Sequence, residues 1–135
     1  QGNAAGGSGF NETITTAFFY AYVKESNGAS PTLMYNTGKD LGNATTYATL
    51  SADQTNTDAD GAVSGYLHLF NPASTTFVKH YLGRVSNPNG AGSTTYVCDC
   101  HSSGYFNTTS AIDEISFKFS TGEIQGGTIQ MFGVI

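Results

Sequence analysis

The amino-acid sequence predicts an all-β protein that folds as an antiparallel two-sheet sandwich, jelly-roll-like, with about eight strands. Thr, Tyr, Phe and Val, the side chains that fit a pleated and half-buried surface, recur in short runs along the chain. Gly, Asn, Asp and Ser, which favour turns, separate these runs. No window keeps apolar residues at the i, i+3, i+4, i+7 spacing of an amphipathic helix, so few or no helices are expected.

The first strand is predicted over residues 13–24, because β-branched and aromatic side chains fill both sets of alternate positions, as they do in a central strand. The further strands are expected at residues 32–35, 43–50, 62–70, 76–85, 94–100, 112–119 and 128–134. Pro72 sets a turn between the strands at residues 62–70 and 76–85, which should therefore pair as neighbours. Residues 87–92 (NPNGAG) carry the strongest loop signal. Nearly every aromatic residue in these strands is expected in the core.

The chain has 135 residues, which is enough for one domain with one hydrophobic core and too few for two ordinary domains. Residues 1–10 have low complexity and are rich in Gly and Ser, so we expect a flexible N-terminal arm there. The β-sandwich domain is predicted to occupy residues 11–135.

The last ten residues are largely apolar up to the end of the sequence. The strand predicted at residues 128–134 should therefore be buried in the domain or against a neighbouring subunit. Gly126 and Gly127 precede it and permit a positive φ or a bulge that leads into the strand, and Gly133 permits a close backbone approach beside Phe132. These glycines are predicted to be structural residues.

Charge and hydropathy each argue against one class of partner. Five Lys and Arg residues stand against ten Asp and Glu residues, and the formal net charge is -5. Binding to nucleic acid depends on clustered basic side chains, so no nucleic-acid partner is expected. No apolar run approaches the roughly 20 residues that span a bilayer, so we expect no membrane partner either.

Cys98, Cys100 and His101 form the most reactive-looking cluster in the sequence. On a strand the two cysteines point to the same face, and together with His101 they offer three soft or borderline ligands to a metal ion. A structural zinc site usually has four ligands, however, and a disulfide between cysteines two residues apart on a strand would be strained. Three interpretations are open: two free or core thiols, which the usual burial of cysteine favours, a disulfide or inter-subunit bridge, and a metal site.

Asn56, Asp58 and Asp60, followed by Gly61, match the opening of a calcium-binding loop, with oxygen ligands at alternate positions before a glycine turn. Position twelve of that pattern is Leu67, where a bidentate Glu is needed. An ordinary acidic turn is therefore the favoured interpretation, and a calcium loop is the alternative.

No arrangement of reactive side chains predicts catalysis. No serine or carboxylate spacing around His68 or His80 builds a nucleophile and base pair. Asp113 and Glu114 are adjacent, so their side chains diverge on a strand. We therefore predict that the protein is not an enzyme, and we expect no cofactor.

The C-terminal third repeats glycines and apolar residues at recognisable spacing. The pattern consists of GYFNTTSAID at residues 104–113, ISF at residues 115–117, STG at residues 120–122 and GGTIQMFGV at residues 126–134. It resembles the C-terminal signature of β-sandwich structural proteins of tailed bacteriophages, a group common among marine phages. The segment YLHLFNP at residues 66–72 is similar to a strand-to-turn step of the same family.

This resemblance implies a virion structural protein on the exterior of the particle, serving as a capsid decoration, a tail fibre component or a tail-associated module. By the same analogy the partners are other virion proteins and copies of this chain, with a homotrimer favoured. The alternative is a carbohydrate- or receptor-binding module of a phage adhesin, in which exposed Tyr and Asn contact a cell-surface glycan.

Overall fold

A computed structural model gives the structure of residues 1–26, 31–52, 61–90 and 95–134. The described residues contain no α-helix, and Thr37–Lys39 form a short 3-10 helix, η2. The strands in chain order are β1 (Gly2–Ala4), β2 (Ile14–Lys24), β3 (Thr32–Tyr35), β4 (Leu41–Ala44), β5 (Ser64–Leu69), β6 (Lys79–Asn89), β7 (Tyr96–Phe106) and β8 (Ile112–Ile115). The all-β fold class predicted from the sequence is confirmed.

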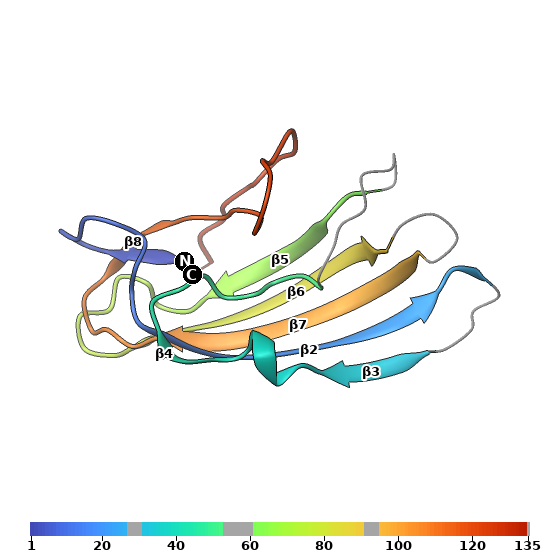
Figure 1. Ribbon diagram of the computed structural model, residues 1–135. Helices are drawn as coiled ribbons and strands as arrows, with labels where there is room; N and C mark the ends of the chain where they lie inside the picture. The colour runs from blue at the N-terminus through green and yellow to red at the C-terminus, as the bar shows by residue number, and fades with distance from the viewer. Residues whose placement is uncertain (27–30, 53–60, 91–94, 135) are drawn as a thin grey trace.

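The strands form two antiparallel sheets (Figure 1). The larger sheet has the order β3-β2-β7-β6-β5, and β4 also pairs with β2, nearer the beginning of that strand than β3. The smaller sheet pairs β1 with β8 and lies on one side of the larger sheet. The molecule is therefore a sandwich of two unequal sheets, one of six strands and one of two.

The long strands β2, β6 and β7 form the centre of the larger sheet. β2 and β7 pair without interruption over 11 residues each, beginning with Ile14 opposite Phe106. Along β6, buried and exposed residues alternate from Lys79 to Asn87. Because successive side chains on a strand point to opposite faces, this alternation means that one face of the sheet is covered and the other faces solvent.

Two clusters of buried side chains fill the space on the covered face. The first contains Phe18, Ala52, Val85, Cys98 and Cys100, and the second contains Ile14, Tyr81, Phe106 and Ile112. Ala52 and the half-buried Leu50 belong to the segment that follows β4, whereas Ile112 belongs to β8. The covering layer therefore consists of the small sheet together with the segment after β4.

The N-terminal residues differ from the flexible arm expected over residues 1–10. Gly2–Ala4 form β1 and pair with β8, and the Asn3 side-chain amide donates a hydrogen bond of 2.9 Å to the Glu114 carboxylate. Asn3 is buried. A Gly-rich local composition cannot reveal this strand, because the partner that orders it lies 111 residues later in the chain.

At the other end of the chain, the strand predicted over residues 128–134 is not formed, and the one predicted over residues 112–119 ends at Ile115. The side chains of Ile129 and Met131 are exposed rather than buried in the domain. The apolar composition of this segment suits a strand, but no described strand of the same chain pairs with it.

The loop predicted over residues 87–92 begins later than expected. β6 continues through Asn89, and Asn87 is buried on the covered face. Pairing with β7 outweighs the local turn preference here, since the register runs on to Asn89 opposite Tyr96.

Among the described residues, no helix is long and apolar enough to cross a membrane.

Candidate functional site

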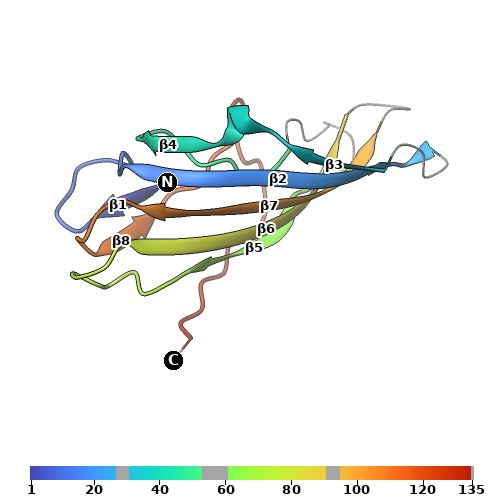
Figure 2. The ribbon, with the colours of Figure 1, turned by 90° about the horizontal axis from the view of Figure 1, so that it is seen from below.

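The side of the six-stranded sheet that points away from the core is open, and we call it the outer face. Alternate residues of β2, β3, β5, β6 and β7 form it. Figure 2 looks onto this face, and no described segment crosses it. Its exposed large apolar side chains are Phe19, Leu33, Tyr35, Tyr66, Phe70, Leu82 and Val97. Several large apolar side chains exposed on one face are typical of sites of interaction with proteins or ligands.

Several aromatic residues on this face were expected in the core, and that expectation was wrong for them. Phe19, Tyr66 and Phe70 are exposed, whereas Phe18 and Tyr81 are buried as predicted. Aromatic side chains occupy both faces of the larger sheet, but the second layer covers only one of these faces. Burial therefore depends on the covering layer, which strand periodicity does not report.

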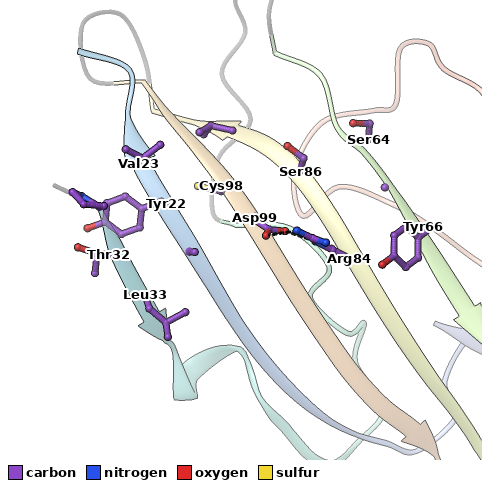
Figure 3. A pocket seen from close by; sticks show the side chains of 14 residues that line it. Tyr22, Val23, Thr32, Leu33, Ser64, Tyr66, Arg84, Ser86, Cys98 and Asp99 are labelled. Atoms are coloured by element: carbon purple, nitrogen blue, oxygen red, sulfur yellow. Dashed lines mark hydrogen bonds and ion pairs between the residues drawn. The ribbon is translucent and has the colours of Figure 1, made fainter. Parts of the chain in front are cut away.

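An open groove of about 880 Å³ crosses the outer face between β3 and β5 (Figure 3). Val23 and Leu33 line it on the side of β2 and β3, and Tyr66 lines it on the side of β5. Arg84 of β6 and Asp99 of β7 lie between these two walls. A second hollow of about 500 Å³ shares Tyr66 and Arg84 with the groove and is also lined by Phe19 and His101.

An ion pair occupies the centre of the groove. The register between β6 and β7 places Arg84 opposite His101 and diagonal to Asp99. The Nε and Nη2 atoms of Arg84 each donate a hydrogen bond of 2.8 Å to one carboxylate oxygen of Asp99, and Nε2 of His101 lies 3.4 Å from Oδ2 of Asp99. The side chains of Arg84 and Asp99 are 53% and 40% exposed. Water therefore weakens the attraction, and the pair contributes little to the stability of the fold.

The chemistry of this pair suits binding rather than proton transfer. The hydrogen bonds from Arg84 lower the pKa of Asp99 below its usual value. The carboxylate is therefore ionised at neutral pH and acts only as an acceptor, while the guanidinium acts only as a donor. A polar ligand in the groove would find one donor group and one acceptor group side by side.

Aromatic rings border the pair on both sides. The rings of Phe19 and His101, which are opposite each other on β2 and β7, stack in parallel with centroids 4.9 Å apart. On β5, Tyr66 contacts His68 edge-on with centroids 5.1 Å apart, and His68 stacks on Phe70 with centroids 6.4 Å apart. The outer face thus combines flat apolar rings with a central pair of charged groups.

The structure does not bring Cys98, Cys100 and His101 together as one site. Cys98 and Cys100 are free and fully buried on the covered face of β7, whereas the ring of His101 lies on the outer face against Phe19. Burial raises the pKa of both thiols, that of Cys100 to about 11. The thiols are therefore protonated at neutral pH and serve as core residues.

The separation follows from the alternation of side chains along a strand, which gives residue 101 the opposite parity to residues 98 and 100. Within the part of the chain that the structure describes, no group of three His, Cys, Asp or Glu side chains is close enough to hold a metal ion. Asn56, Asp58 and Asp60, the candidate calcium loop, lie outside the described residues.

The three predicted structural glycines lie in the exposed C-terminal segment. Gly127 has a φ of 138°, a conformation that favours glycine, as predicted for this position. A Cβ atom added at Gly126, Gly127 or Gly133 would meet no atom within 4 Å. The close backbone approach expected at Gly133 is therefore absent among the described residues, because no strand lies beside this segment.

Sequence reasoning did not identify the pair of Arg84 and Asp99. A signal was present, since two residues of opposite charge lie on two strands predicted to follow one another. Recognising the contact also required the register of β6 on β7, which two strands joined by a loop of unknown geometry do not reveal.

Comparisons with protein-family models, with curated proteins and with solved structures found no match.

Proposed function

We propose that this protein is a virion structural protein, located on the exterior of a phage particle, that acts through contacts with other protein subunits and not as an enzyme. One observation carries the proposal: two apolar surfaces of this small domain are covered by no other described segment of the chain. The first is the outer face. The second is the C-terminal segment, in which the side chains of Met131 and Val134 are 89% and 91% exposed. Surfaces of this kind gain free energy when another subunit covers them.

The resemblance of residues 104–134 to the C-terminal signature of tailed-phage structural proteins supports the location in a virion. The chemistry of the groove supports a binding role, because its ionised carboxylate is already paired with a guanidinium. Capsid decoration, tail fibre component and tail-associated module are the settings in which such a domain would serve. Its partners there would be other virion proteins and copies of itself, with a homotrimer favoured.

The experiment that tests this proposal is the measurement of mass in solution. Sedimentation equilibrium of the full chain over a wide range of concentrations should show a defined oligomer, with a mass of three chains as the favoured result. A single chain of 14.1 kDa at every concentration, with no binding to purified virion proteins, would contradict the proposal.

A second candidate function is binding of a cell-surface glycan in the groove. Tyr66, 55% exposed, presents its ring beside the pair of Arg84 and Asp99. Sugar rings stack on aromatic faces, and sugar hydroxyls can donate to a carboxylate and accept from a guanidinium.

A glycan array with the full chain tests this second function. Binding should be lost in Tyr66→Ala and retained in Tyr35→Ala, a matched control in which an exposed tyrosine outside the groove is removed. Equal loss in both variants, or no glycan bound by the unmodified protein, would argue against a sugar site in the groove.

A further inference from the structure

The C-terminal segment, residues 128–134, has no partner among the described residues. It forms no strand, and residues 117–134 make no backbone hydrogen bond to the rest of the described chain. Figure 2 shows the last described residues running past β5 and out beyond the outline of the sheet. The segment is thus directed away from its own domain.

The sequence of this segment suits a strand that is covered on both faces. If it is extended, Ile129 and Met131 point to one side, and Phe132 and Val134 point to the other. All four side chains are exposed in the single chain. A strand at a free surface normally carries apolar residues on one face only, so this pattern predicts neighbours on both sides.

β5 offers a free edge. It is the last strand in the order of the larger sheet. The backbone N–H of Phe70 donates to the carbonyl of His80 at 2.9 Å, and this bond fixes which residues of β5 point their backbone groups toward β6. The groups of residues 66 and 68 are directed to β6, so those of Gly65, Leu67 and Leu69 are directed to the open side.

This edge lacks the features that usually block strand addition. β5 contains six residues, and none of them is charged or a proline. At the opposite edge of the sheet, β3 has four residues and follows Pro31, which cannot donate a backbone hydrogen bond. β4, which flanks β2 beside β3, also has only four residues. Of the outer strands of the larger sheet, β5 is therefore the best template for an added strand.

We infer that residues 128–134 of one copy of the chain add as a strand to the free edge of β5 in a second copy. This inference rests on the proposed assembly function and names the contact that would produce it. The seven residues of the segment match the six residues of β5 in length. One side of the added strand would lie beside Leu67 and Leu69, and the other side would lie beside Tyr66 and Phe70 of the outer face.

Strand addition would give a partner both to the C-terminal segment and to the free edge of β5. The backbone groups of the free edge gain hydrogen bonds, which supply affinity, and the alternate side chains supply specificity. The connection is head-to-tail, since the segment of one subunit meets a different surface on the next. Such contacts close into rings when the rotation between subunits allows it. A ring of three copies would agree with the favoured trimer.

The first test introduces two charges into the segment and measures mass by sedimentation equilibrium. The double variant Met131→Asp, Phe132→Asp should assemble roughly 100-fold more weakly than the unmodified chain, because two apolar side chains would lose their burial. Met34→Asp is the control, since it places an aspartate on an exposed apolar position at the opposite edge of the sheet, outside the groove and on the side away from the outer face. Circular dichroism would verify that both variants keep their strands.

The possible outcomes separate the inference from the function on which it rests. An oligomer that persists in the double variant would overturn the strand addition and leave the assembly function standing. A single chain at all concentrations in the unmodified protein would contradict the assembly function itself. Loss of assembly in Met34→Asp alone would place the interface at the β3 edge and also overturn the inference.

A second test distinguishes addition between copies from addition within one copy. His68→Cys protein is mixed with a protein carrying Gln130→Cys or Met131→Cys, which present a thiol on opposite sides of the segment, and the mixture is oxidised. In an antiparallel addition, residues 66 and 68 would form the closely spaced, non-hydrogen-bonded pairs with the added strand, where a disulfide fits. A disulfide-linked dimer is expected in one of the two mixtures.

The matched control replaces His68→Cys with Leu33→Cys and should give no linked dimer above the background of the unmodified chain. A bridge that forms only when both cysteines are in the same molecule, in a species with the mass of one chain, would show that the segment returns to its own β5. That result would overturn the inference.

Discussion

The two faces of the larger sheet are built by the same strands but have opposite surroundings. On β2, Phe18 is 1% exposed and its neighbour Phe19 is 40% exposed. On β7, Cys98 and Cys100 are buried, while Asp99 between them forms an ion pair at the surface. The difference does not arise from composition, because both faces carry aromatic residues. It arises because β1, β8 and the segment after β4 cover one face only, which leaves the other available to partners.

The largest expected difference between the faces concerns the two neighbouring phenylalanines. Phe18→Ala should lower the free energy of unfolding by about 3–5 kcal/mol, because it opens a cavity in the core. Phe19→Ala should lower it by less than about 1 kcal/mol, since the ring is already partly in water. Urea denaturation followed by circular dichroism measures both values. Similar losses in the two variants would mean that the outer face is covered in the isolated chain.

A glycine provides a second comparison. Gly104 of β7 lies on the covered face, where an added Cβ would stand 2.4 Å from the carbonyl oxygen of Thr15 and 2.9 Å from Cε1 of Tyr81. Gly104→Ala should therefore destabilise the protein by about 1–3 kcal/mol, the usual cost of overpacking a core. Gly42→Ala is the control, because nothing lies within 4 Å of its added Cβ. The urea midpoint of Gly104→Ala should be clearly lower than that of Gly42→Ala, and equal midpoints would contradict the packing described here.

A third comparison uses pH. An unfolded thiol ionises near its ordinary pKa of 9.0, whereas burial raises the pKa of folded Cys100 to about 11. Between these values the unfolded chain has released a proton that the folded chain retains, so the stability should fall as the pH rises from about 9 to about 11. Cys100→Ser should make this dependence shallower.

The control for this measurement places a thiol on the other face of the same strand. Ser103→Cys, on the outer face of β7, adds a partly exposed group and should leave the slope of stability against pH unchanged. A steeper slope in Ser103→Cys, or an unchanged slope in Cys100→Ser, would show that the two faces do not differ in their effect on a thiol.

The smallest expected effect concerns the surface ion pair. Asp99→Asn should change the urea midpoint at neutral pH only slightly, because both partners are largely in water. Arg84 lowers the pKa of Asp99 in the folded state, so the small stabilisation exists above the ordinary pKa of 3.8 and is lost as the pH falls. Comparing midpoints of the variant and the unmodified chain at pH 7 and at acidic pH measures this contribution. A large loss at pH 7 would indicate that the pair is structurally essential.

The sequence was sufficient to predict the fold class and the long strands, because their period of two is a local property. The strand predicted at residues 13–24 became β2, and those predicted at residues 62–70 and 76–85 became the neighbours β5 and β6. The strand β1 was not predictable, since three residues in a Gly-rich stretch become ordered only by their distant partner β8.

The candidate site was less accessible to sequence reasoning than the fold. The sequence shows that Cys98 and Cys100 share one face of their strand and that Asp99 and His101 share the other. Which of these faces is exposed to solvent depends on the covering layer. The groove and the pair of Arg84 and Asp99 also depend on register between strands, and no local pattern determines register when both faces carry apolar side chains. The predicted burial of residues 128–134 could not be met within one chain, and this discrepancy led to the inferred contact with a second copy.

The pairing of β1 with β8 has a mechanical consequence. Gly2 lies opposite Ile115, and the backbones of Gln1 and Ser116 are hydrogen-bonded to each other. The chain therefore enters and leaves this two-stranded sheet at the same end. Tension applied through residues 1 and 116 would pull the two strands apart one rung at a time, instead of shearing all their rungs together. Under such tension we expect β1 and β8 to separate before the strands of the larger sheet do.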